Sequence, residues 1–160
     1  MAEVVADASV LIALAQIGQL SLLQRLFGEI VIPPAVAHEV SPSLPQIPGW
    51  IETRAVQRPL DARVIAARLD PGETEAIALA LQAKVERVIL DDLPARRLAM
   101  RLGLGLGVIG TAGVLFLAKQ RELIPAVRPS LDALKAAGFR LRKDVYDEVL
   151  KAAGENAAEA

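Results

Sequence analysis

Cysteine is absent from the 160 residues of this chain. Its absence excludes disulfides, thiolate nucleophiles, iron–sulfur clusters and the usual structural zinc sites, because all of these need cysteine sulfur. Any metal ion that the chain binds is therefore expected to be held by oxygen ligands.

Histidine, aromatic residues and net charge are also scarce. His38 is the only histidine, and because no Gly-x-Ser-x-Gly turn occurs, a Ser-His-Asp hydrolase is not indicated. Aromatic residues make up 3% of the chain, and Trp50 and Tyr146 are too isolated to suggest a platform for stacking bases. The formal net charge is −1, so binding to nucleic acid would depend on a local basic patch rather than a broad positive field.

Long hydrophobic runs are missing as well. Hydrophobic residues make up 53% of the chain, but charges interrupt every run before it reaches the roughly 18–20 residues that a membrane span requires. The N-terminus has no basic region ahead of an apolar stretch, which is unlike a secretion signal. We therefore expect a cytoplasmic protein without membrane association, with one domain over residues 1–154 and a frayed tail at 155–160.

Short apolar segments alternate with helix-like segments along the chain. Strands are predicted at residues 4–6, 29–32, 50–56, 86–90 and 107–109. Helices are predicted at residues 10–26 with a break at Gly18, and at 34–40, 61–69, 71–83, 93–102 and 111–120. This alternation is the α/β pattern of a parallel sheet that helices cover on both faces.

Four acidic signals stand where apolar sequence meets a turn or a helix start. They are Asp7, Glu39, Glu75 and the pair Asp91-Asp92. Carboxylates that cluster on a mostly buried framework repel one another and lose hydration, and a bound cation relieves both penalties. Their joint presence therefore predicts a site for Mg²⁺ or Mn²⁺.

Each acid alone also has a purely structural explanation. Asp7 fits a helix N-cap, and Glu39 fits a solvated side chain near a helix end. Glu73 fits the third residue of a capping box that Asp70 begins, so we leave it out of the site. Glu75 lies in a helix whose other faces are apolar, so its carboxylate is expected to border the core and to need a partner.

The topology expected for a parallel sheet favours reading the acids together. Ligand sites in open parallel sheets lie outside the carboxyl ends of the strands, where Asp7 and Asp92 both stand. If those two strands are neighbours, Glu39 and Glu75 need only project from flanking helices to complete an oxygen-rich cage. Asp91 and Asp92 point to opposite faces if extended, so one is expected to reach the site and the other to cap the next helix.

Five segments carry a family resemblance in order over nearly the whole chain. They span residues 5–12, 32–40, 72–80, 90–96 and 109–113. These segments resemble the PIN-domain family, which includes the VapC-type toxin ribonucleases. The resemblance implies a PIN-like three-layer α/β/α sandwich with a central, mostly parallel sheet.

The chain departs from the compact toxins at two positions and in length. Those toxins usually carry Asp where this chain has Glu75, and Thr or Ser where it has Leu90. The segment at residues 138–150 also exceeds the compact pattern. The chain thus resembles a longer branch of the family.

The resemblance implies metal-assisted hydrolysis of RNA phosphodiester bonds, with an antitoxin protein as a further partner. Asp7, Glu39, Glu75 and Asp92 fall on the family's metal-binding acids and would be the catalytic residues, with Mg²⁺ or Mn²⁺ as cofactor and Asp91 as a further ligand.

Four residues are candidates for substrate binding. Ser9 and Thr111 would hold the phosphate or a metal-bound water, with plain N-caps as the alternative. Arg96 and Arg97 would contact the RNA backbone, with a solvated helix face as the alternative.

A second hypothesis stays open: a catalytically degenerate PIN-fold module for oligomerisation or nucleic-acid binding, which Glu75 and Leu90 favour. The pattern Gly-x-Gly-x-x-Gly at residues 105–110 is expected to turn the chain rather than to bind a dinucleotide, because the required strand does not precede it. Apolar helix faces in residues 10–26 and 111–117 predict a homodimer.

Overall fold

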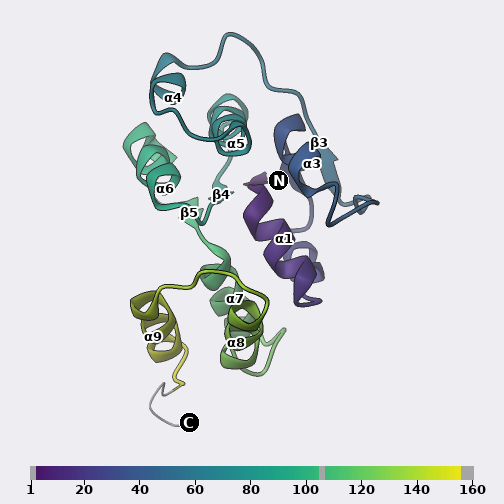
Figure 1. The fold of residues 1–160 in the computed structure, drawn as a ribbon, viewed down its shortest axis with the longest axis vertical. Helices are drawn as coiled ribbons and strands as arrows, with labels where there is room; N and C mark the ends of the chain where they lie inside the picture. The colour runs from purple at the N-terminus through teal and green to yellow at the C-terminus, as the bar shows by residue number, and fades with distance from the viewer. Residues whose placement is uncertain (1–2, 105–106, 156–160) are drawn as a thin grey trace.

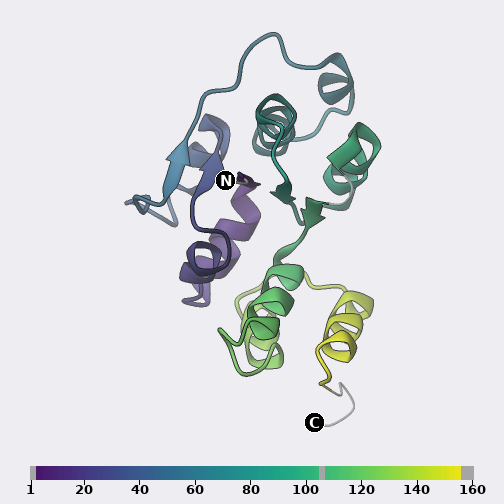
Figure 2. The same cartoon turned by 180° about the vertical axis from the view of Figure 1, so that it is seen from behind.

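A five-stranded sheet forms the centre of the protein, with the strand order β3-β2-β1-β4-β5. The computed structural model describes residues 3–104 and 107–155. All four strand pairings are parallel, as the sequence predicts, and Figures 1 and 2 show the molecule from opposite sides. The strands are β1 (Val4–Ala6), β2 (Ile30–Ile32), β3 (Ile51–Thr53), β4 (Arg87–Ile89) and β5 (Val108–Ile109).

The central strands are apolar because both of their faces are covered. Every residue of β1 and β2 is buried, as expected for the middle of a doubly covered parallel sheet. Val5 pairs with Val31 on one side and with Val88 on the other. β1 and β4 are therefore neighbours, which is the condition for their acidic ends to meet.

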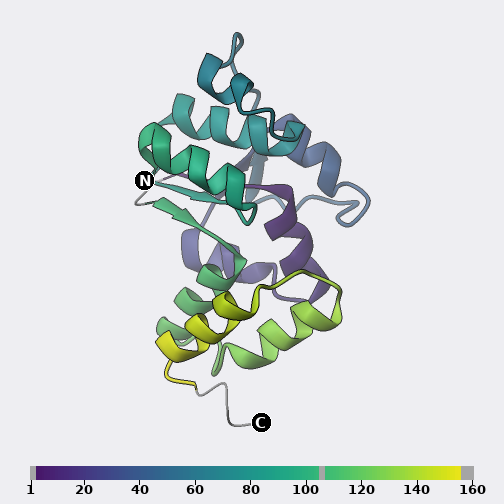
Figure 3. The ribbon, with the colours of Figure 1, turned by 60° about the vertical axis from the view of Figure 1, so that its left-hand side comes forward.

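Helices lie on both sides of the sheet, which gives the three-layer sandwich that the sequence predicts. In Figure 3, α4, α5 and α6 lie above the strands, and α2 and α7 lie below them. The helix α3 packs against both α1 and α5. The helices are α1 (Ala8–Gln16), α2 (Ser21–Phe27), α3 (Pro34–Val40), α4 (Ala62–Ala66), α5 (Pro71–Ala83), α6 (Leu93–Ala99), η1 (Met100–Leu104), α7 (Thr111–Gln120), α8 (Arg128–Ala136) and α9 (Lys143–Ala152).

Two predicted helices differ from the structure. The helix predicted at 61–69 is reduced to α4, and the chain then turns through Arg68, whose φ of 55° lies in the left-handed region. The helix predicted at 93–102 ends at Ala99 and continues as the wider π-type turn η1, where Gly103 has a φ of 91°. Backbone turns therefore determine where α4 and α6 end, and the spacing of apolar residues in the sequence does not predict such turns.

The C-terminal segment adds two helices that the sequence analysis did not predict. α8 and α9 extend the α7 side of the sandwich, and the three lie together at the lower end of the molecule in Figure 1. Leu131 and Leu150 are both fully buried, so this pair is part of the fold.

Glu155, the first residue of the predicted frayed tail, is held in place through its carboxylate, which accepts three hydrogen bonds. Its carboxylate accepts from Lys119 Nζ at 3.0 Å and from the backbone N–H groups of Val127 at 2.8 Å and Arg128 at 3.1 Å. The remainder of that tail, residues 156–160, lies outside the described residues, as does part of the glycine pattern at 105–110.

The apolar helix faces that suggested a homodimer are used inside one chain. Val10, Leu14, Leu22 and Leu23 are fully buried in the common core. The homodimer stays a prediction, now without this support. Within the described residues no single helix is long and apolar enough to span a membrane, and α1 and α2 meet that criterion only as a pair bent by 119°.

Candidate metal centre at the carboxyl edge of the sheet

The acids meet at the edge where β1 and β4 end. Asp7 follows β1 directly, and its backbone N–H donates to the carbonyl of Ile89 at the end of β4, with an N–O distance of 3.0 Å. Asp91 and Asp92 follow two and three residues after Ile89. The parallel pairing of the two strands therefore brings their acidic ends to the same edge.

Asp7 is buried without a hydrogen-bond partner for one of its oxygens. Its exposed fraction is 4%, and Oδ1 has no partner. Burial, as the largest cause, and the charges of Asp70, Glu39 and Asp91 together raise the pKa of Asp7 from 3.8 to about 7, against the opposing effect of the nearby N–H of Ala8. The side chain forms no cap hydrogen bond to α1, so the N-cap interpretation does not explain it.

Glu73, which the sequence analysis left out, lies within this acidic group. Burial raises its pKa from 4.5 to about 8, and the charges of Asp70, Asp92 and Asp7 contribute in that order. Asp70 caps α5 by accepting from the N–H of Glu73 at 2.8 Å. The capping prediction holds for Asp70, but the Glu73 carboxylate faces the other acids and makes no hydrogen bond within the described part of the chain.

Glu75, which the sequence analysis placed in the cage, is not brought together with the other acids. Its Oε1 accepts from the N–H of Ala35 at 3.0 Å, and its Oε2 pairs with Nη2 of Arg58 at 3.0 Å. The carboxylate therefore joins the start of α5 to the start of α3. Its charge is not among those that raise the pKa values of Asp7 or Glu73.

Glu39 reaches the group from the last turn of α3. Its Oε1 accepts from the N–H of Gly72 at 3.1 Å, and a Cβ on Gly72 would overlap this oxygen. Burial raises the pKa of Glu39, and the charge of Asp70 adds to the effect, against the opposing influence of Gly72 N–H and His38. A residue without a side chain at 72 is thus what lets the Glu39 carboxylate approach α5.

Asp91 and Asp92 divide their roles. Asp91 accepts from the N–H and the hydroxyl of Thr111, at 2.7 and 2.6 Å, and from the hydroxyl of Ser9 at 3.5 Å. Asp92 caps α6 by accepting from the N–H of Ala95 at 3.1 Å. The charge of Asp91 contributes to the raised pKa of Asp7, and the charge of Asp92 contributes to the raised pKa of Glu73.

Ser9 and Thr111 are not N-caps. Neither α1 nor α7 has a side-chain cap hydrogen bond, and the residue before α7 is Gly110. Both hydroxyls instead donate to Asp91, and Thr111 is only 5% exposed. These two residues orient Asp91 from two helix starts.

Arg96 and Arg97 lie in different surroundings. Nη1 of Arg96 donates to the carbonyl of Leu90 at 3.2 Å, which holds the guanidinium at the end of β4. A Cβ on Gly110 would come within 2.7 Å of that Nη1 and 2.8 Å of Oδ1 of Asp91, so only glycine leaves room for both. Arg97 is exposed.

The set of donors suits a hard divalent cation in kind and in charge. All are carboxylate oxygens, and the Oδ1 of Asp7 is buried without a partner. Burial first and mutual repulsion second raise the pKa values of Asp7 and Glu73, and a bound cation would offset both effects. Across residues 3–104 and 107–155, no three acidic or histidine side chains converge closely enough to hold one ion as they stand. Glu39 and Asp92 are turned toward backbone N–H groups, so side-chain rotation is needed to close the site.

The structure thus combines a five-stranded parallel sheet with acidic residues near the carboxyl ends of β1 and β4. Over residues 3–155 the chain matches the family described as "DUF3368: PIN domain", and it belongs to the PIN-domain family. PIN domains are generally nucleases and typically use a divalent metal. The family resemblance and the sandwich fold inferred from the sequence are thereby confirmed.

One solved structure shares this fold. It is a PilT N-terminus domain protein from the archaeon Sulfolobus solfataricus, with a TM-score of 0.52 and 18% identity over 70% of this chain and 89% of that chain. At this identity the likeness concerns the fold alone. No curated protein matches the chain.

Proposed function

We propose that this protein is a metal-dependent endoribonuclease that hydrolyses RNA phosphodiester bonds. The observation that carries the proposal is the buried, partnerless Oδ1 of Asp7 among like-charged carboxylates at the carboxyl edge of the sheet. A buried group of this kind is costly to the fold, and such groups are typical of functional sites.

Asp7, Glu39, Glu73 and Asp91 are the ligands that we propose, with Asp92 next to Glu73. Bound Mg²⁺ or Mn²⁺ would polarise the scissile phosphate and lower the pKa of an attacking water. The hydroxyls of Ser9 and Thr111 hold Asp91 in one orientation, and the Asp7 carboxylate is kept away from bulk water by the core. In the set of four catalytic acids that the sequence predicted, Glu73 thus replaces Glu75, and Asp91 replaces Asp92.

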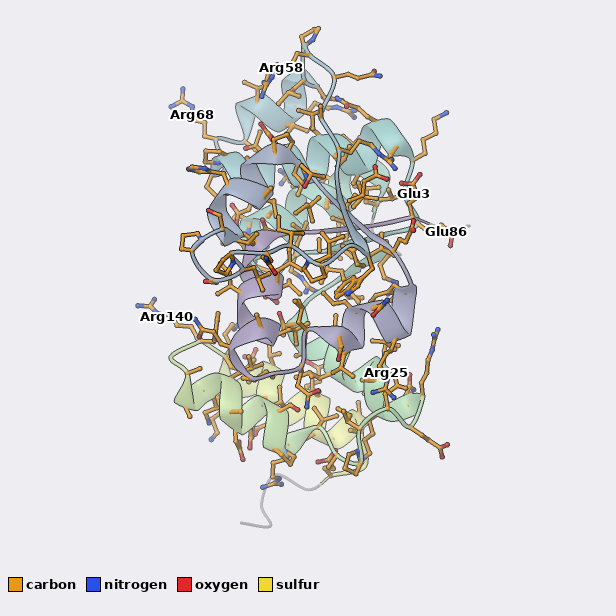
Figure 4. All side chains as sticks on the ribbon, turned by 90° about the vertical axis from the view of Figure 1, so that its right-hand side faces the viewer. Glu3, Arg25, Arg58, Arg68, Glu86 and Arg140 are labelled. Atoms are coloured by element: carbon orange, nitrogen blue, oxygen red, sulfur yellow. The ribbon has the colours of Figure 1, made fainter. Side chains whose placement is uncertain are left out.

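Exposed arginines on the same side as the acids support a polyanionic substrate. In Figure 4, Arg68 and Arg140 project on the side where β1 ends, above and below the site, whereas Glu3 and Glu86 project at the opposite edge. We propose that these two arginines, together with Arg96 and Arg97, supply the local positive charge that a chain of net charge −1 needs in order to bind RNA.

The finer biological role is part of the proposal. We propose a cytoplasmic enzyme that acts as the toxin of a toxin–antitoxin pair, with an antitoxin protein as the partner that restrains it. Its support is the resemblance of the motifs around Asp7, Glu39 and Asp91-Asp92 to those of VapC-type toxins.

The test is cleavage of a mixed pool of single-stranded and structured RNAs in Mn²⁺. Cleavage is expected for the wild type and for Glu86→Gln, whose carboxylate lies at the far edge of the sheet, and is expected to be lost in EDTA and in Asp7→Asn. A parallel pool of single-stranded DNA tests whether RNA is the preferred substrate.

The rival function is a non-catalytic interaction module on the same fold. It is favoured by the lack of three converging acids among the described residues and by the engagement of Glu75 with Arg58. Absence of cleavage together with absence of Mn²⁺ binding in calorimetry would establish the rival and overturn the nuclease.

A further inference from the structure

A cavity of about 530 Å³ opens beside the acidic group. Its first wall belongs to the site already described and includes Ser9, Asp91 and Thr111. Its second wall comes from the α8–α9 connection at residues 139–142 and from α9. Residues more than a hundred positions apart in the sequence therefore enclose one space.

The lining of the cavity combines apolar side chains with cations. Leu93, Phe139, Leu141 and Val145 supply apolar surface, and Phe139 is one of only three phenylalanines in the chain. The cationic side chains of the lining are Arg96, Arg140 and Arg142.

The three arginines differ in how far they are engaged. Arg96 is held by the carbonyl of Leu90, and Arg142 pairs with Asp144 at 2.8 Å in an ion pair that is exposed on both sides. Arg140 makes no ion pair with any other described residue and projects from the molecule in Figure 4. Arg140 is thus the cation of the second wall that is available to an anionic ligand.

We propose that this cavity binds one nucleotide of the RNA substrate, with its base against Phe139 and its phosphates between Arg96 and Arg140. This inference rests on the proposed function, because it gives the substrate of the acidic site its adjoining pocket. The α8–α9 extension would then select RNA segments that present an unstacked base next to the bond that is cleaved.

Three features of the cavity favour this occupant. Its volume lies within the range of roughly 300–1,000 Å³ found for small-ligand pockets, which accommodates a nucleotide. An aromatic ring beside guanidinium groups is the usual means by which proteins hold a single-stranded base and its backbone. Asp91 lies in its wall, so a nucleotide bound there would place a neighbouring phosphodiester at the acids.

The acid on the second wall does not oppose this assignment. Glu148 of α9 also lines the cavity, and a carboxylate accepts hydrogen bonds from the amino groups that bases carry on their edges. Arg140, which makes no ion pair with any other described residue, lines the same wall and adds a positive charge to it.

The experiment compares Phe139→Leu with wild type on RNAs that lack one base. Binding of a labelled single-stranded RNA is measured by fluorescence anisotropy in EDTA, where no cleavage occurs. The same measurement is made on a series of RNAs that each lack the base at one position, and this position differs from one RNA to the next. Loss of the ring is expected to weaken binding of intact RNA about tenfold. When the missing base is the one that stacks on Phe139, the affinity of the wild type for RNA is expected to fall by about the same factor. The affinity of Phe139→Leu is then expected to be the same for the abasic RNA as for intact RNA.

The matched control is Phe27→Leu, which removes a phenylalanine ring that packs against Arg87 far from the cavity. Its RNA affinity is expected to equal that of wild type. Two results would overturn the pocket. In the first, Phe139→Leu and wild type bind intact RNA with equal affinity; in the second, Phe139→Leu binds every abasic RNA more weakly than the wild type by the same factor. A cavity that receives a segment of a protein partner instead would give the first of these two results.

Arg140→Gln provides a second test that does not disturb the core, because this side chain is exposed. It is expected to raise KM for RNA severalfold, to leave kcat unchanged and to reduce the salt dependence of binding by about one phosphate contact. Unchanged KM in a cleaving enzyme overturns the pocket alone. A wild-type protein that neither binds nor cleaves RNA overturns both the proposed function and the pocket.

Discussion

At the scale of single residues, Asp7 stands out among the described residues as a buried carboxylate with one oxygen that has no hydrogen-bond partner. It sits at the junction of a fully buried strand and a buried helix, so its carboxylate cannot reach water. Its Oδ1 has no donor, although most buried polar atoms in proteins have one. A role in binding a cation, rather than a role in stabilising the fold, would explain why a carboxylate occupies this destabilising position.

Replacement of Asp7 by asparagine is expected to stabilise the metal-free protein, and more so at high pH. Because the pKa of Asp7 rises from 3.8 to about 7 on folding, the folded state holds the proton more tightly than the unfolded chain between these values. The fold is therefore favoured below about pH 4 and loses up to about 4 kcal/mol as the pH rises through 7. Urea denaturation in EDTA at about pH 4 and pH 8 measures the difference between Asp7→Asn and wild type.

The same pair of proteins separates ionisation from packing. Mn²⁺ at high pH is expected to raise the melting temperature of the wild type but not that of Asp7→Asn, because the ion binds the folded carboxylate. An equal gain in stability for Asp7→Asn at both pH values would show that the cost of Asp7 does not come from its charge.

At the scale of secondary-structure elements, the packing of α3 against α5 sorts the acids. The carboxylate of Glu39, at the end of α3, accepts a hydrogen bond from the start of α5, and the carboxylate of Glu75, in α5, accepts one from the start of α3. The two carboxylates thereby satisfy backbone N–H groups that the helix starts leave unpaired. Glu73, one helical turn before the buried Ile77, is left facing Asp7 and Asp92.

Glu73→Gln and Glu75→Gln form a matched pair that tests this sorting. We expect Glu73→Gln to lower kcat for RNA about 100-fold, since it removes a charged ligand. Glu75→Gln is expected to keep kcat and to cost less than about 1 kcal/mol, because the amide oxygen still accepts from Ala35 and the lost partner, Arg58, is 64% exposed. A Glu75→Gln variant as inactive as Glu73→Gln would restore the set of ligands that the sequence predicted.

At the scale of the whole molecule, α8 and α9 both complete the core and enclose the cavity. Leu131 and Leu150 are buried, and Glu155 ties the chain after α9 to Lys119 of α7 and to the backbone just before α8. Removing this segment would therefore damage the fold and the proposed nucleotide pocket together. Point substitutions, rather than truncations, are needed to separate the two roles.

Glu155→Gln is expected to destabilise the protein at neutral pH. Burial opposes ionisation of Glu155, but the N–H of Val127, the Lys119 ammonium and the N–H of Arg128 outweigh it and lower the pKa below its usual 4.5. Its stabilising effect is thus present above the unfolded pKa and lost as the pH falls through the folded value.

We expect a loss of about 1–3 kcal/mol at pH 7 in urea denaturation and little difference near pH 3. Glu86→Gln, which changes an exposed carboxylate at the far edge of the sheet, serves as the control and is expected to behave as wild type. A loss that is the same at both pH values would assign the role of Glu155 to its shape rather than its charge.

Local sequence was sufficient to predict three features: the succession of most strands and helices along the chain, a parallel sheet, and the edge of the sheet at which Asp7 and Asp91-Asp92 stand. Apolar periodicity, Pro34 and Pro71 at helix starts, and glycine at turns are properties of short segments, so they can be read without knowing the fold. The exceptions were α8, α9 and the C-terminal ends of α4 and α6, which depend on backbone turns and on tertiary contacts such as those between α7 and α9.

Two features of the proposed site depend on the tertiary structure. The first is which acid of the pairs Glu73/Glu75 and Asp91/Asp92 lies toward Asp7, and the second is the cavity beside these acids. Glu73 and Glu75 are about 200° apart around α5, so the choice between them follows from how that helix lies on the sheet and on α3. Asp91 and Asp92 point to opposite sides of the chain, and the position of Thr111 at the start of α7 determines which one it holds. The direction of a side chain is a tertiary property, because it depends on neighbours that are distant in the sequence.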